Sequence, residues 1–142
     1  MNHIYFAAIA MMLSSSLQAS ESDQDTPKIV VTPLLTTNVT ASGQPIVLPQ
    51  TNAQVRVSEY EIPPSAILPE HKHLYPRYGY VLAGTLRVTN TETGKTDVYK
   101  AGDFILEAVG QWHRAATVGD EAVKLLVIDQ VEKDQNNVIM RK

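Results

Sequence analysis

The stretch "SAILPEHKHLYPRYGYVLAG" (Ser65–Gly84) decides how the rest of the chain is interpreted. It contains His71 and His73, two residues apart, and then Arg77. Alternate residues of a β-strand point to the same face, so both imidazoles project to one side if this segment is extended. Imidazole is a ligand for Zn, Cu, Fe and Ni. Taken alone, however, the pair fits a metal site and two ordinary surface or core histidines equally well.

A second stretch, "GDFILEAVGQWHRAAT" (Gly102–Thr117), adds a third histidine, His113. Together the two stretches resemble the two motifs of the cupin superfamily, G-x5-H-x-H-x3-4-E-x6-G and G-x5-P-x-G-x2-H-x3-N. The resemblance covers residues 54–129 and keeps the spacing of six motif positions, which are His71, His73, Gly84, Gly102, Gly110 and His113.

The resemblance implies an all-β fold, a double-sheet antiparallel jelly-roll barrel. It also implies that His71, His73 and His113 converge on one divalent transition metal, which would be Fe, Mn, Ni, Zn or Cu. Short β-type runs separated by turn residues independently indicate an all-β sandwich or barrel. These runs are KIVVT, PIVLP, AQVRVSEYEI, YGYVLAGTLRVTN, KTDVYKA, DFILEAV, WHRAATV and AVKLLVIDQV.

Arg77 is the departure from the motif that matters chemically. It stands where the family has a Glu ligand, and a guanidinium cannot lose its proton to bind a cation. A guanidinium near a metal is a bidentate fork for a carboxylate or phosphate, so Arg77 is a candidate substrate anchor. A surface position after Pro76 is the alternative. The three other departures, Ser65, Ala108 and Thr117, are interpreted as changes of scaffold.

Glu107 is the candidate for the missing carboxylate, since many small cupins resemble this sequence in placing a Glu just before the second-motif Pro position. A carboxylate in the apolar run DFILEAV needs a partner if it is buried. Three interpretations stay open: a metal ligand, a salt-bridge partner of Arg77, or a solvent-exposed residue. Tyr75 and Trp112 flank the histidines in sequence and are candidates for the pocket mouth, although simple packing also explains them.

The first 19 residues are expected to be a secretory signal. The apolar run Ile4–Leu13 is too short for a bilayer, which needs about 20 residues, and small residues follow it up to Ala19. The protein is therefore predicted to be exported, as a secreted or periplasmic protein, and to have no membrane span after the signal is removed. No Lys or Arg precedes Lys28, so an uncleaved anchor or a buried N-terminal helix remains the alternative.

The remaining boundaries are a lead-in and arm strand over 20–40, the barrel over 41–131, and a tail over 132–142 expected to extend beyond it. KIVVT or the tail would supply an exchanged strand in a homodimer. The 142 residues suit one domain, and a net charge of -3 without a basic excess argues against nucleic acid. The absence of cysteine excludes disulfides and thiolate ligands.

These features favour an exported metal-binding cupin that handles a small-molecule ligand or substrate. One hypothesis is a metal-dependent enzyme acting on a small, carboxylate-bearing molecule through the three histidines. The alternative is a non-catalytic cupin module that binds a small ligand or a metal. Fold alone does not choose between them.

Overall fold

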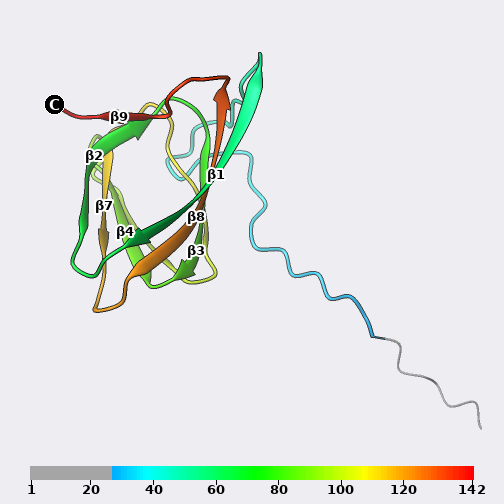
Figure 1. Cartoon of the computed structure of the whole chain (residues 1–142), viewed down its shortest axis with the longest axis vertical. Coiled ribbons are helices and arrows are strands. Elements are labelled where there is room, and N and C mark those ends of the chain that lie inside the picture. Colours follow the sequence, from blue (N-terminus) through cyan, green and yellow to red (C-terminus); the bar gives the residue numbers. More distant parts are fainter. Residues whose placement is uncertain (1–26) are drawn as a thin grey trace, which may run out of the picture. The chain divides into compact units, whose positions relative to one another are not determined.

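Nine strands and no helix make up residues 27–142, the part of the chain that the computed structural model describes (Figure 1). The predicted signal segment, 1–19, lies outside the described residues. Residues 32–142 form one compact unit, and residues 27–31, which belong to a second unit, have no regular structure. The prediction of a strand at KIVVT was therefore wrong for its described residues, and PIVLP contributes only one bridge, between Pro45 and Val39.

The strands form two antiparallel sheets, which confirms the predicted all-β jelly-roll barrel. One sheet has the order β1-β8-β3-β6 and the other β5-β4-β7-β2-β9. The strands are β1 (Ala53–Ile62), β2 (Ile67–His73), β3 (Arg77–Ala83), β4 (Thr85–Asn90), β5 (Thr96–Lys100), β6 (Phe104–Leu106), β7 (His113–Thr117), β8 (Val123–Glu132) and β9 (Val138–Met140).

The core lies between the two sheets and follows from strict alternation along the strands. In β8 every second residue is buried, beginning at Val123. Val81 of β3, Leu86 of β4 and Ile105 of β6 pack in the same cluster. Because alternate residues face opposite sides, each strand gives one row to the interior, and that row carries both the core and the polar groups described below.

A β-bulge in β2 sets the direction in which its histidines point. Leu68 pairs with Ala115, but the next pair in register is His71 with His113, so β2 has one extra residue there. A bulge of this kind shifts the alternation of one strand relative to its partner. Leu68 can therefore pack against the core while His71, three residues later, is also buried.

Two turns show how the backbone behaves where the family motif has glycine: one keeps the glycine, at Gly84, and the other has Ser65 in its place. Gly84 has φ of 74°, and a Cβ there would lie 2.5 Å from the carbonyl oxygen of Ala122, so only glycine fits. Ser65 stands where the family motif has glycine and keeps a positive φ of 62°. The backbone turn is thus retained at Ser65 without the residue that adopts it most easily.

The C-terminal tail is part of the barrel, which corrects the expectation that it extends beyond it. In β9, Met140 pairs with His71 and Val138 pairs with His73. Arg141 also forms an ion pair with Glu70, at 2.7 Å. The run VIM therefore covers the edge of β2, the strand that carries two of the three histidines.

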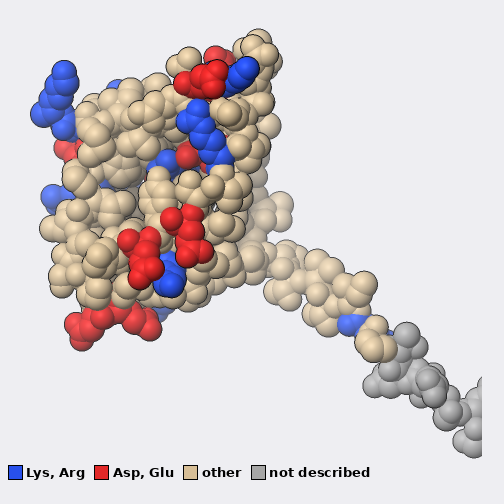
Figure 2. Space-filling view, viewed as in Figure 1, with Lys and Arg blue, Asp and Glu red and all other residues tan. Residues whose placement is uncertain are grey.

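Charged side chains on the surface seen in Figure 2 are interspersed, with acidic and basic residues side by side and no broad patch of one sign. Within residues 27–142, no helix is long and apolar enough to cross a membrane.

Candidate metal centre

Four ligating side chains converge inside the barrel. One ligand atom from each of His71, His73, Glu107 and His113 lies within 4.8 Å of the others. The histidines are 8%, 0% and 3% exposed in chain order, and the Glu107 side chain is 18% exposed. The structure therefore brings together the three predicted histidines. It places Glu107 beside them, and not in a salt bridge with Arg77 or out in the solvent.

Both sheets contribute to this cluster. His71 and His113 are direct cross-strand partners on β2 and β7, and His73 lies two residues along β2 on the same face. Glu107 follows β6 of the other sheet. The chain after it crosses to the end of β2, where Gly110 donates its N–H to the carbonyl of His73 at 2.7 Å. The turn at Gly110, with φ of 72°, makes this crossing feasible.

Backbone carbonyls orient two of the imidazoles. Nδ1 of His71 lies 2.7 Å from the carbonyl oxygen of Pro69, and Nδ1 of His113 lies 2.9 Å from that of Gln111. A carbonyl only accepts, so each Nδ1 carries a proton and Nε2 is the nitrogen that faces the interior. This is the arrangement in which histidine ligands of metals are usually held.

The carboxylate of Glu107 contacts the inward nitrogens of His73 and His113. Its Oε2 is 3.0 Å from Nε2 of His73 and 3.2 Å from Nε2 of His113. Burial alone would raise the pKa of Glu107, but the hydrogen bonds from His113 and His73 outweigh it and hold that pKa well below its usual value. Burial likewise opposes the charged form of His113, yet the hydrogen bond to Glu107 raises the pKa of His113. The carboxylate is therefore ionised and available as an anionic ligand.

The donor set fits a divalent metal. Nε2 of His73 and Nε2 of His113 are only 3.2 Å apart. Nitrogen and oxygen ligands lie about 2.0–2.2 Å from a metal such as zinc. Two ligand atoms that subtend an angle between a right angle and the tetrahedral angle at the metal are therefore about 3–3.5 Å apart. Three imidazoles and one carboxylate also match what Fe, Mn, Ni, Zn and Cu accept. The residues thus suit a metal in both chemistry and spacing.

Arg77 pairs with Asp129 and not with Glu107. Its Nε and Nη2 donate to the two carboxylate oxygens of Asp129, at 2.7 and 2.8 Å, and both residues are buried. Asn137 donates a further hydrogen bond to Asp129, at 2.5 Å. Burial would raise the pKa of Asp129, but these hydrogen bonds prevail and lower it. Arg77 therefore stands inside the barrel, where the alternative of a surface residue does not apply.

The two aromatic candidates lie away from the cluster. The ring of Trp112 is in contact with two cations, the Lys72 ammonium at 4.7 Å and the Arg141 guanidinium at 5.4 Å. Lys72 alternates with the inward histidines of β2 and so belongs to the outer face. The backbone N–H of Tyr75 donates a hydrogen bond to the side-chain oxygen of Asn137, at 2.8 Å. Neither ring lines the small cavities that adjoin the cluster in residues 27–142.

The sequence interpretation missed Asp129 and Asn137. Asp129 had a detectable signal, because it shares its alternation with Val127 and Val131, which are buried. An acidic residue on the inward row of a strand needs a cationic partner. Asn137 had no such signal, since its role depends on β9 folding back onto β2.

Comparison with known proteins defines the class. The family model described as the cupin domain matches residues 58–129, about half of the chain, and the chain belongs to this family. No curated protein matches the sequence significantly.

Solved structures support the same fold. An oxalate decarboxylase from Lactobacillus farciminis, in its formate complex, is 21% identical with a TM-score of 0.52 over 61% of this chain and 26% of its own. The polyketide cyclase RemF from Streptomyces resistomycificus is 20% identical with a TM-score of 0.53, over 69% and 70%. A structure of the DMSP lyases RdDddP and RnDddQII is 17% identical with a TM-score of 0.54, over 62% and 44%. At these identities the likeness concerns the fold, and the chain spans about a quarter of the oxalate decarboxylase chain.

Proposed function

We propose that this protein is an exported cupin that binds one divalent transition metal and uses it to act on a small, carboxylate-bearing molecule. The observation that carries the proposal is the convergence of the four ligand atoms of His71, His73, Glu107 and His113 within 4.8 Å. Three imidazoles and a carboxylate that are buried together form a ligand set that divalent transition metals accept.

The four ligands would leave positions open on a metal that accepts more than four. When bound, such a metal polarises a carboxylate or carbonyl oxygen as a Lewis acid. Mn is a reasonable first choice, because one structure similar in fold concerns the Mn(II) centres of Bacillus subtilis oxalate decarboxylase. The carboxylate of Glu107 would offset one of the two positive charges.

Arg77 enters this proposal as a residue that would contact the substrate. Two of its nitrogens, Nε and Nη2, are engaged by Asp129. The guanidinium also lines the apolar cavity between the sheets, together with His71 and Glu107. Its remaining nitrogen, Nη1, is the atom through which Arg77 would reach a ligand.

Elemental analysis of protein purified without an affinity tag tests the metal centre. We expect about one divalent metal per chain in the wild type and a loss of nearly all of it in His113→Ala, because His113 would supply one of the four ligand atoms. Lys124→Met, on the outer face of β8, is the control and should keep its metal. A metal content that is the same in His113→Ala and wild type would refute the metal centre.

Catalysis and simple binding separate on turnover. Product formation or oxygen consumption with a panel of small carboxylates supports the enzyme. Saturable binding without consumption supports the non-catalytic module instead.

Export rests on the sequence of the first 19 residues. The mass of protein recovered from the periplasm or the medium tests it, since cleavage after Ala19 gives a chain that starts at Ser20. An intact N-terminus in the cytoplasmic fraction would contradict export.

A further inference from the structure

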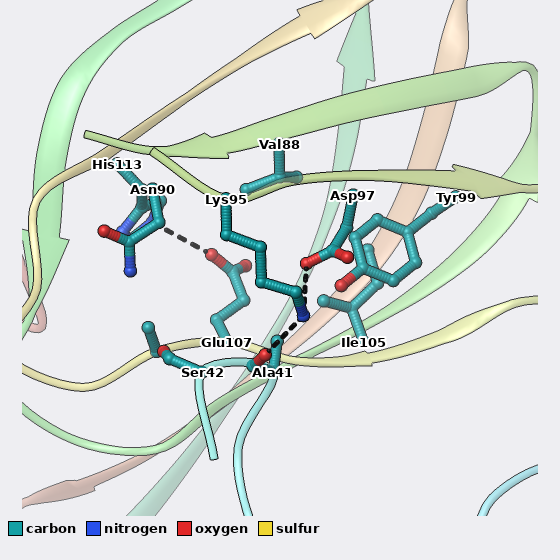
Figure 3. A pocket seen from close by; sticks show the side chains of 11 residues that line it. Ala41, Ser42, Val88, Asn90, Lys95, Asp97, Tyr99, Ile105, Glu107 and His113 are labelled. Carbon is teal, nitrogen blue, oxygen red and sulfur yellow. Dashed lines mark hydrogen bonds and ion pairs between the residues drawn. The ribbon is translucent and has the colours of Figure 1, made fainter. Parts of the chain in front are cut away.

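A cavity of about 30 Å³ adjoins Glu107 and His113, and its mouth lies beside the start of β5 (Figure 3). Val88, Ile105 and the ring of Tyr99 give it apolar walls. A space of this size holds one or two water molecules. A larger ligand can therefore reach the cluster from this side only if the mouth opens.

The mouth is covered by a short segment that we call the strap, residues 40–44. Ala41 of the strap donates its N–H to the carbonyl of Leu106, at 2.8 Å. The side chain of Gln44 bonds both backbone groups of Val109, at 2.7 and 3.0 Å. The strap is thus anchored to the Glu107 side of the mouth by a few hydrogen bonds, while most of the residues on either side of it are exposed.

Lys95 holds the opposite side of the mouth. Its ammonium donates to the carbonyl oxygen of Ala41, at 3.0 Å, and lies 3.0 Å from a carboxylate oxygen of Asp97 (Figure 3). The Lys95 side chain is 55% exposed. An ammonium has three N–H donors, and two are accounted for by these contacts. Lys95 can therefore accept an anionic group without first losing Asp97.

The other polar groups at the cavity favour a ligand that accepts hydrogen bonds. Burial, aided by the charges of Asp97 and Glu107, raises the pKa of Tyr99 to about 12, so its phenol stays protonated. Ser42 also lines the mouth, where its hydroxyl donates a long hydrogen bond to the side-chain oxygen of Gln44, at 3.5 Å. With a divalent metal in the cluster, its two positive charges exceed the one negative charge of Glu107, and an anion is favoured there as well.

We propose that Lys95 is a second anionic-group anchor of this site, which makes the ligand a small molecule with two anionic groups, such as a dicarboxylate. One group binds at the metal, and the other binds the ammonium of Lys95 in place of the carbonyl of Ala41, so that the strap loses its hydrogen bond to Lys95 when the ligand enters. The inference rests on the proposed metal centre but adds a residue and a ligand class to it.

The test compares Mn-loaded full-length mature protein with its variants in binding acetate, malonate, succinate and glutarate, measured by titration calorimetry. In the wild type we expect at least one dicarboxylate to bind about tenfold more tightly than acetate, the usual gain from one charge-assisted contact. Lys95→Met should abolish this advantage, so that the ratio of dicarboxylate affinity to acetate affinity falls to about one. Asp97→Asn, which frees the Lys95 ammonium from its fixed partner, should increase the advantage a few-fold.

Lys124→Met is the matched control, a surface lysine on β8 whose 3.6 Å ion pair with Glu61 is remote from the mouth, and it should bind like the wild type. The metal content of every sample is measured in parallel. A dicarboxylate advantage that persists in Lys95→Met, or no advantage in metal-loaded wild type, would overturn the anchor. Loss of metal from the wild type itself would instead refute the metal centre.

Discussion

The barrel buries two charged clusters that differ in one respect. In the first, Arg77, Asp129 and Asn137 satisfy one another, with a two-point ion pair and a third hydrogen bond. In the second, the three histidines and Glu107 point lone pairs and a carboxylate at a common centre, and Nδ1 of the fully buried His73 has no partner among residues 27–142.

The difference separates a structural cluster from a functional one. In a buried ion pair the two charges offset each other without any further group, and removing one member leaves an uncompensated charge. A group of opposed ligand atoms is complete only when something else occupies its centre. Substitutions in the first cluster should therefore change stability, whereas substitutions in the second should change what the protein binds.

The largest effect is expected from Asp129→Asn. The side chain keeps its shape but loses the charge that balances the buried Arg77, so we expect the free energy of unfolding to fall by about 3–5 kcal/mol. Urea denaturation measures it. The control is Glu61→Gln, which breaks an exposed cross-strand pair with Lys124 and should change stability by less than about 1 kcal/mol. Equal effects of the two variants would contradict a structural role for the buried pair.

The stability difference between wild type and Asp129→Asn should also depend on pH. Because the pKa of Asp129 is lowered in the folded state, its charge stabilises the fold above the unfolded pKa of about 3.9. This stabilisation is lost as the pH falls through the lower folded pKa. The stability gap between wild type and Asp129→Asn should therefore be full at pH 6 and narrow below about pH 4. A gap that widens on acidification would show that another group carries the effect.

A smaller loss is expected from Asn137→Ala. Asn137 is 2% exposed, and its side chain joins the N–H of Tyr75 to the carboxylate of Asp129. Removing it leaves a buried donor unpaired, which costs about 1–3 kcal/mol. Thermal unfolding measures the change, with Asn136→Ala as an exposed neighbour for comparison. If Asn137→Ala were as stable as the wild type, Asn137 would contribute little to the cluster that it forms with Arg77 and Asp129.

The smallest effect on stability is expected from Glu107→Gln. An amide of the same size can still hydrogen-bond the imidazoles, so the metal-free protein should change by less than about 1 kcal/mol. Metal affinity should instead fall about 10- to 100-fold, because one anionic ligand is lost. Chelator competition measures the affinity. If Glu107→Gln kept its metal but lost much of its stability, Glu107 would stabilise the fold and would not be a metal ligand.

Much of the fold and part of the site could be predicted from local sequence. The β-type runs at residues 53–62 and 122–131 predicted β1 and β8 nearly to the residue, and the glycines at 84, 102 and 110 do adopt positive φ. The strand Ile67–His73 was partly missed, because Pro63, Pro64 and Pro69 indicate a connection. Pro69 is accommodated in the bulge before His71, where the regular ladder is interrupted.

By itself, the sequence determined which residues can bind a metal, since the identities and spacing of three histidines carry that chemistry. It also placed Glu107 among the candidate ligands. Only the tertiary structure decided that Arg77 pairs with Asp129, that Asn137 of the tail completes this pair, and that Lys95 faces the strap. The physical reason is that the bonded residues are 52, 62 and 54 positions apart along the chain, counting from Arg77 to Asp129, from Tyr75 to Asn137 and from Ala41 to Lys95. Their meeting depends on how the two sheets pack and on no local pattern.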